Sequence, residues 1–122
     1  YNAEEYNKLL KEFIQAGADK VILEARESGV SVGVMDDQGN PITDRLDKVL
    51  EDIDTRKILF EAPKKSQQVF FLKKFGPETS LGNIHPNDAI SVETLRRGMR
   101  GDTMNDFYNV IVDRHLEKQG KK

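Results

Sequence analysis

The sequence contains no cysteine, and this absence excludes both a disulfide framework and a thiolate metal site. It has no apolar run near the roughly eighteen residues that a membrane-spanning helix needs, and no basic-then-apolar leader opens the chain. An excess of charge of one sign is also missing, because 19 basic residues are interspersed with 21 acidic ones. We therefore expect a cytoplasmic globular chain with no membrane and no nucleic-acid partner.

Several stretches have the apolar spacing of amphipathic helices. We expect the first over residues 3–16, capped by Asn2 and stopped by Gly17. Thr43 is expected to cap the second, and Gly76 follows the third, at residues 66–75. A fourth is expected to begin near Pro86 or Asp88 and to weaken at Gly98, and a further helix is expected over residues 107–116. The predicted inward positions of the second and fourth helices are Leu46, Val49, Leu50, Ile53, Ala89, Val92, Leu95 and Met99.

Two short apolar runs, at residues 20–25 and 57–62, alternate with these helices, and residues 79–84 are expected to form a third strand. The first two repeat one pattern, namely Lys, three apolar residues, Glu and Ala, which indicates a repeated βα unit. Each run is short and apolar on both faces, as a buried parallel strand must be. The fold class expected from this order is α/β, with a parallel sheet that is either doubly wound or closed into a barrel.

Polar residues stand near the end of each expected strand: Glu24, Glu61 and Asn83. In both kinds of parallel α/β fold, ligands meet the carboxyl ends of the strands, so we expect these three side chains to share one edge. A carboxylate there is costly to desolvate unless a metal, a cation or a substrate group pairs with it. The alternative is that each glutamate is a structural partner of Arg26 or Lys64.

Six segments together resemble the phosphosulfolactate synthase family, and they span about Glu4 to Met104. They are residues 20–29, 58–63 followed by Lys65 and Gln67–Gln68, 75–77, 81–84, 93–96 and 100–103. The resemblance implies a (β/α)8 TIM barrel of which residues 1–122 supply about the last three βα units, with residues 104–122 as a C-terminal extension. Such a barrel takes roughly 250 residues, so an N-terminal half must be supplied by another segment. Without it, the inner face and both edges of the sheet would lie open to water.

The family activity implied is the Mg²⁺-dependent addition of sulfite to phosphoenolpyruvate, which gives (2R)-phospho-3-sulfolactate on one route to coenzyme M. The expected partners are therefore small anionic substrates, the remaining half of the barrel and further copies of the same protein in a homo-oligomer. The alternative is a non-catalytic barrel relative with a stress-protective or partner-binding role.

Three substrate anions require cations and oriented N–H donors. We expect Glu24 and Glu61 to hold Mg²⁺, because this ion prefers one or two carboxylates plus water. Arg26 is the expected clamp for a substrate anion, which gives the catalytic set Arg26, Glu24 and Glu61. The expected substrate-binding residues are Lys65, Gln68, Asn83 and His85, with backbone N–H groups near Asn87 and Asp88.

Several of these residues also have an alternative interpretation that involves no substrate or metal. Lys65 could be a solvated lysine that opens a helix, and His85 a polar residue at the edge of the sheet. Arg26 could pair with Glu27 or Glu61. The long connection from Arg26 to Thr43 is either a lid or a small surface hairpin. No residue is assigned as the general acid that returns a proton to the second carbon.

Overall fold

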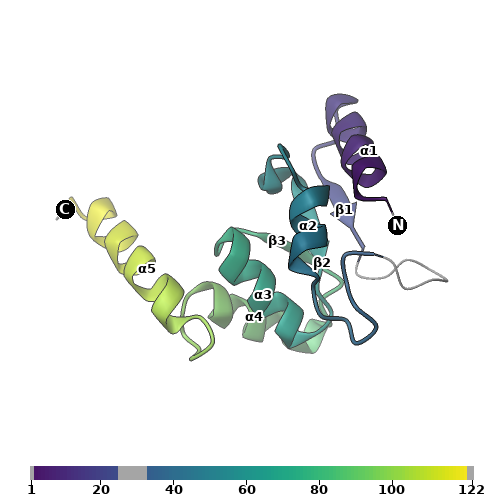
Figure 1. Cartoon of the computed structure of the whole chain (residues 1–122). Coiled ribbons are helices and arrows are strands. Elements are labelled where there is room, and N and C mark those ends of the chain that lie inside the picture. The colour runs from purple at the N-terminus through teal and green to yellow at the C-terminus, as the bar shows by residue number, and fades with distance from the viewer. Residues whose placement is uncertain (1, 25–32, 121–122) are drawn as a thin grey trace.

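The computed structural model describes residues 2–24 and 33–120 (Figure 1). Helices and strands alternate up to Gly82, as the sequence predicts, and only helices follow among the described residues. The elements are α1 (Ala3–Gln15), β1 (Val21–Leu23), α2 (Thr43–Val49), η1 (Thr55–Lys57), β2 (Ile58–Glu61), α3 (Lys65–Phe75), β3 (Ser80–Gly82), η2 (Pro86–Asp88), α4 (Ala89–Arg96) and α5 (Met104–Lys118).

The three strands form one parallel sheet in the order β1-β2-β3. Leu23 lies beside Phe60, and Phe60 lies beside Leu81, so the spatial order of the strands follows their order along the chain. The predicted parallel α/β architecture is confirmed. The strands are shorter than the apolar runs that predicted them.

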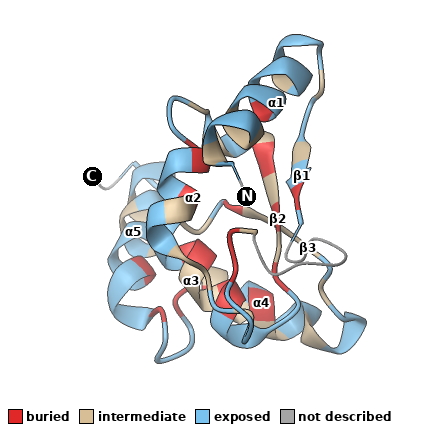
Figure 2. Cartoon of the chain, turned by 45° about the vertical axis from the view of Figure 1, so that its right-hand side comes forward, coloured by how far each residue is buried: buried red, intermediate tan, exposed pale blue. Residues whose placement is uncertain are grey.

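One face of the sheet, which we call the covered face, packs against helices (Figures 1 and 2). Ile58 and Phe60 on this face are completely buried, in a core shared with residues of α1, α2 and α3. The ring of Phe60 stacks on Phe71 and on Phe75, with centroids 4.6 and 4.9 Å apart. Aromatic stacking and apolar burial therefore fix α3 on β2.

The opposite face of the sheet, which we call the open face, carries Ile22 and Leu59. Ile22 is 58% exposed, although it lies directly beside Leu59 in the sheet. The side chain of Leu59 lies against Gly82, where an added Cβ would meet it. Exposure of Ile22 agrees with the expectation that this face of the sheet lies open to water in this chain.

Helix starts follow the sequence at α1 but not at α2. Asn2 caps α1 as predicted, because its side-chain oxygen accepts hydrogen bonds from the N–H groups of Glu4 and Glu5. Thr43 is the first residue of α2 and not its cap, which corrects the prediction. The capping position belongs to Ile42, whose N–H donates to the Val34 carbonyl across 2.7 Å and keeps that residue extended.

In the fourth helix, two of the four predicted inward positions are correct. Val92 and Leu95 are buried, whereas Ala89 is exposed and Met99 is 67% exposed. The reason for Met99 is that α4 ends at Arg96 and the chain turns at Gly98, whose φ is +63°. Residue 99 therefore leaves the helical stripe on which the prediction relied.

The described part of the long connection forms a small hairpin, residues 34–42. Met35 and Pro41 make an antiparallel bridge, and the Asp36 carboxylate accepts hydrogen bonds from the N–H groups of Gln38 and Asn40. The hydrogen bonds from Asn40 lower the pKa of Asp36 below its ordinary value. Val34 and Met35 at the base are buried in the core, so this segment is a surface hairpin anchored by apolar residues.

Helix α5 packs at its start on α3 and α4. Phe107 is buried with Leu72 and Leu95, and the Thr103 hydroxyl donates to the Leu95 carbonyl across 2.6 Å. Among residues 2–24 and 33–120, no helix combines the length and apolar character required to cross a membrane.

Candidate functional site

The candidate site is the carboxyl edge of the sheet, where Glu24 and Glu61 lie side by side. Leu23 pairs with Phe60 in the parallel register, so Glu24, which directly follows β1, and Glu61, the last residue of β2, stand at adjacent positions of this edge. Because side chains alternate along a strand, both glutamates belong to the open face, on the side opposite Phe60. Glu24 is exposed and Glu61 is partly buried.

Two neighbouring carboxylates suit a hard divalent cation that keeps several waters. The residues fit Mg²⁺ in that limited form, since Glu24 and Glu61 provide two oxygen donors at one sheet edge. Within the described ranges, no group of three or more histidine, cysteine, aspartate or glutamate side chains could hold a metal ion. A cation at this edge would therefore depend on these two glutamates, on water and on substrate oxygens.

The third strand brings Asn83 and His85 to the same end of the sheet. Gly82 pairs with Glu61, and Asn83 follows it in the left-handed region, with φ of +54°. His85 precedes the short 3-10 helix η2, and its Nδ1 accepts a hydrogen bond from the Asn87 N–H across 3.1 Å. Both side chains are exposed, and their role as substrate ligands stays a prediction.

The backbone N–H groups named as phosphate donors in this turn already have partners. The Asn87 N–H donates to His85 Nδ1, and the Asp88 N–H donates to the His85 carbonyl across 2.8 Å. A phosphate would have to displace these bonds. The start of α3 is therefore the stronger candidate for an anion, because α3 is a longer helix and lysine occupies its first position.

Lys65, the first residue of α3, forms an ion pair with Asp102, with 3.1 Å between Nζ and Oδ2. The hydrogen bond and charge of Lys65 hold the pKa of Asp102 below its ordinary value. Roughly half of the Lys65 side chain is exposed, so its ammonium is accessible to an anion that competes with Asp102. Asp102 stands far from Lys65 along the chain, so no local sequence pattern indicates this pair.

Gln68 is almost completely buried, and its side-chain amide donates to the Ala62 carbonyl across 3.0 Å. It thereby ties α3 to the end of β2, next to Glu61. Because its side chain is buried, Gln68 would act on a substrate chiefly by fixing the backbone of Ala62. Arg26, the predicted clamp, lies outside the described residues.

A separate basic hollow of about 600 Å³ lies at the amino end of β3 and includes Arg96, Arg97 and Arg114. Arg96 donates to the carbonyls of Pro77 and Thr79, and burial lowers the pKa of its guanidinium. Arg97 and Arg114 are paired with Glu93 and Glu78. These cations have protein partners at the edge opposite Glu24 and Glu61, so the hollow is not the candidate site.

Comparison with known proteins shows that most of this chain, including the candidate site, is similar to one protein family. The model of the family described as (2R)-phospho-3-sulfolactate synthase (ComA) matches residues 1–102. The phosphosulfolactate synthase of Methanocaldococcus jannaschii is 50% identical over 96 residues, which cover 79% of this chain and 38% of the relative. Those of Methanothermobacter thermautotrophicus and Bacillus subtilis are each 44% identical, over 80% and 84% of the chain. The chain spans about two-fifths of the length of these relatives, namely 38–40%.

Proposed function

The chain belongs to the (2R)-phospho-3-sulfolactate synthase family, and from this premise we propose that it forms the strand-end part of an enzyme that adds sulfite to phosphoenolpyruvate. The observation that carries the proposal is that Glu24 and Glu61 stand at the carboxyl ends of two adjacent parallel strands, on the face that carries the exposed Ile22. Ligands of parallel α/β folds bind at this end.

We further propose that the three strands are part of a (β/α)8 barrel. The strand order follows the chain order with no reversal, and the open face exposes apolar Ile22, as the inner wall of an unfinished barrel would. The remaining strands are proposed to come from an N-terminal half. We call this chain together with that half the complete protein. A cytoplasmic location and assembly into a homo-oligomer stay predictions.

The proposed reaction forms a carbon–sulfur bond. The sulfite sulfur attacks the methylene carbon of phosphoenolpyruvate, the electrons of the double bond move toward the substrate carboxylate, and a general acid then protonates the second carbon. The reaction is an addition, so no group leaves, and an enzyme that catalyses it is a lyase. The product keeps the phosphate and gains a sulfonate.

Residues of this chain have separate tasks in the proposal. Glu24 and Glu61 would hold Mg²⁺, which when bound supplies positive charge beside the substrate carboxylate. The N-terminus of α3 and the Lys65 ammonium would bind the phosphate, in competition with Asp102. Gln68 would keep the end of β2 in place through its bond to Ala62. Arg26 is proposed as the clamp for a second anion.

The test is to incubate the complete protein with phosphoenolpyruvate, sulfite and Mg²⁺ and to follow the phosphorus NMR spectrum. We expect a new phosphate ester that forms only when sulfite is present, with a mass equal to the sum of the two substrates. Omission of Mg²⁺ serves as the control for the cation. Absence of the ester in the presence of all components would overturn the proposal and favour a non-catalytic relative.

A further inference from the structure

The hairpin, residues 34–42, is fastened to the first turn of α3 by two side chains. Lys64 Nζ donates to the Gln38 carbonyl across 2.5 Å, and Gln67 Nε2 donates to the Gly39 carbonyl across 2.7 Å. Gln67 is 2% exposed, and its Oε1 accepts a hydrogen bond from the Lys64 N–H across 2.9 Å. We call Lys64 and Gln67 the clasp.

The tip of the hairpin is shaped to receive the clasp. Gly39 has φ of +82°, and a Cβ there would lie 2.9 Å from Lys64 Nζ and 3.2 Å from Gln67 Nε2. A side chain at this position would crowd both donors, and the positive φ favours glycine there. The hairpin is also held internally by Asp36, and thus the clasp acts on a preformed unit.

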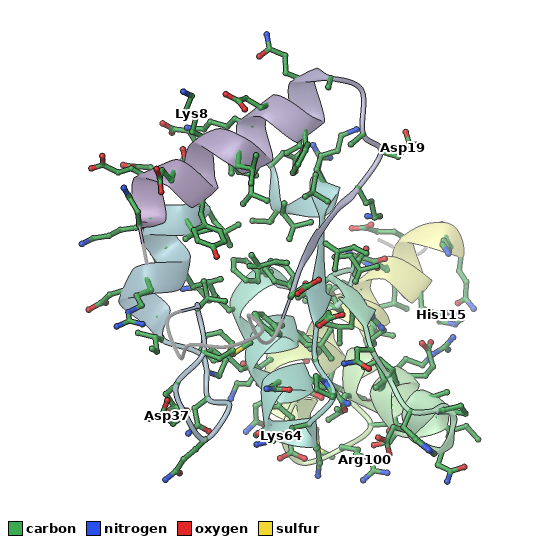
Figure 3. All side chains as sticks on the ribbon, turned by 90° about the vertical axis from the view of Figure 1, so that its right-hand side faces the viewer. Lys8, Asp19, Asp37, Lys64, Arg100 and His115 are labelled. Atoms are coloured by element: carbon green, nitrogen blue, oxygen red, sulfur yellow. The ribbon has the colours of Figure 1, made fainter. Side chains whose placement is uncertain are left out.

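The clasp joins the loops that follow two neighbouring strands. The hairpin lies in the connection after β1, which ends beside Glu24, and Lys64 lies three residues after Glu61 at the end of β2. Figure 3 shows Asp37 and Lys64 at one end of the molecule, with Asp19, which precedes β1, toward the other. The clasp therefore stands at the end of the sheet that carries the candidate site.

We propose that Lys64 and Gln67 are positioning residues, which fix the hairpin against the start of α3 and thereby set the affinity of the candidate site for phosphoenolpyruvate. This inference rests on the proposed function. It assigns the two neighbouring lysines different tasks: Lys65 faces the anion in competition with Asp102, whereas Lys64 is engaged with a backbone carbonyl. The first turn of α3 is then held in place before substrate arrives, which lowers the cost of ordering it on binding.

The experiment compares Lys64→Met and Gln67→Leu with Lys64→Arg and Lys73→Met in the complete protein. Lys64→Arg keeps a cationic donor for the Gln38 carbonyl. Lys73→Met is the matched control, because it removes an exposed lysine of the same helix that pairs with Asp106 at 3.7 Å. The readouts are hydrogen exchange of the hairpin amides, calorimetric binding of phosphoenolpyruvate, and separate KM and kcat values for the sulfite reaction.

We expect Lys64→Met and Gln67→Leu each to speed exchange at Asp36, Gly39 and Asn40 about tenfold, since each removes one hydrogen bond from the hairpin. Phosphoenolpyruvate binding should weaken by a similar factor, with KM changing more than kcat. Lys64→Arg should restore both readouts, and Lys73→Met should leave both unchanged. Lys64→Met alters an exposed side chain, so the test stands even where the buried Gln67→Leu change prevents folding.

Two outcomes would overturn the inference. If binding weakens in Lys64→Met while hairpin exchange is unchanged, Lys64 contacts the substrate directly and is not a positioning residue. If exchange accelerates while binding and KM stay at the Lys73→Met values, the clasp is only structural. Failure of the proposed function has a different signature, because the unaltered protein would then form no sulfite-dependent ester.

Discussion

The covered and open faces of the sheet differ in how far this chain buries their apolar side chains. On the covered face, Ile58 and Phe60 are completely buried by helices of this chain. On the open face, Ile22 is 58% exposed and stands beside the glutamates of the candidate site. Burial of apolar area stabilises the first face within the chain, whereas the second would gain it from the further strands of the proposed barrel. Packing on the covered face therefore stabilises the fold, whereas the open face carries the residues of the proposed reaction.

The largest effect is expected on the covered face. Phe60→Ala should lower the free energy of unfolding of the complete protein by about 3–5 kcal/mol, because it removes a buried ring and leaves a cavity. Urea denaturation measures this change, and Phe60→Leu, which keeps an apolar side chain, should lose clearly less. A loss of the same size for both variants would contradict burial and cavity formation as the main cause, and would assign the stability to the ring stacking at 4.6 and 4.9 Å that both variants remove.

Ile22→Ala tests the open face by the same measurement. If this face lines a barrel, Ile22 becomes buried in the complete protein, and its truncation should cost about 2–5 kcal/mol. A change near zero would mean that the face stays in water after assembly. The proposed barrel would then be wrong, although the parallel sheet would stand.

Glu61→Gln addresses the chemistry of the open face without removing volume. We expect kcat/KM for the sulfite reaction to fall about 100-fold, because one of two charged oxygen donors is lost. The matched control is Glu93→Gln on α4, whose carboxylate pairs with Arg97 on the outer side of the fold. Equal losses in the two variants would contradict a special role for the sheet edge.

Gly98→Ala disturbs the packing of α5 on the covered side. Gly98 has φ of +63°, and a Cβ there would lie 2.9 Å from the backbone nitrogen of Tyr108. We expect a loss of about 1–2 kcal/mol in thermal unfolding, from backbone strain and this collision. Gly101→Ala is the control, since an added Cβ there meets nothing within 4 Å, and it should leave the melting temperature almost unchanged.

The smallest effect is expected from the ion pair between Lys65 and Asp102. Its contribution to stability is present at neutral pH and is lost as the pH falls through the lowered pKa of Asp102 in the folded state. NMR titration of the Asp102 carboxyl should give a pKa below its ordinary value of 3.8, and Lys65→Met should return it toward that value. An unchanged titration in the variant would show that the pair does not form in solution.

The sequence predicts the helices and strands whose formation depends on a periodic apolar face. The repeated Lys-apolar-Glu-Ala pattern predicts β1 and β2, and the apolar stripes predict α1 and α3, because burial of a periodic face dominates those segments. It also predicts that β1 and β2 are adjacent, which places Glu24 and Glu61 at one edge of the sheet, since consecutive parallel strands are usually neighbours. For the connection after β1, the sequence leaves both a lid and a surface hairpin open. The bridge between Met35 and Pro41 favours the hairpin.

Long-range pairing is the part that the sequence does not predict. Asp102 meets Lys65, and Gly39 meets Gln67, only after the helices have packed. The capping role expected of Thr43 fails for the same reason, because a bond between Ile42 and Val34 decides where α2 starts. One bond of the clasp has a local signal. Gln67 stands three residues after Lys64 at the start of a helix, and this spacing is typical of the capping-box bond from the Lys64 N–H to Gln67.

The most direct test of the central claim is a double-mutant cycle on Mg²⁺ affinity, measured by calorimetry in the presence of phosphoenolpyruvate. If Glu24 and Glu61 hold one cation at the shared strand edge, Glu24→Gln and Glu61→Gln should each remove most of the affinity, and the double variant should lose little more. Losses that add independently, or an affinity unchanged in either single variant, would contradict the claim.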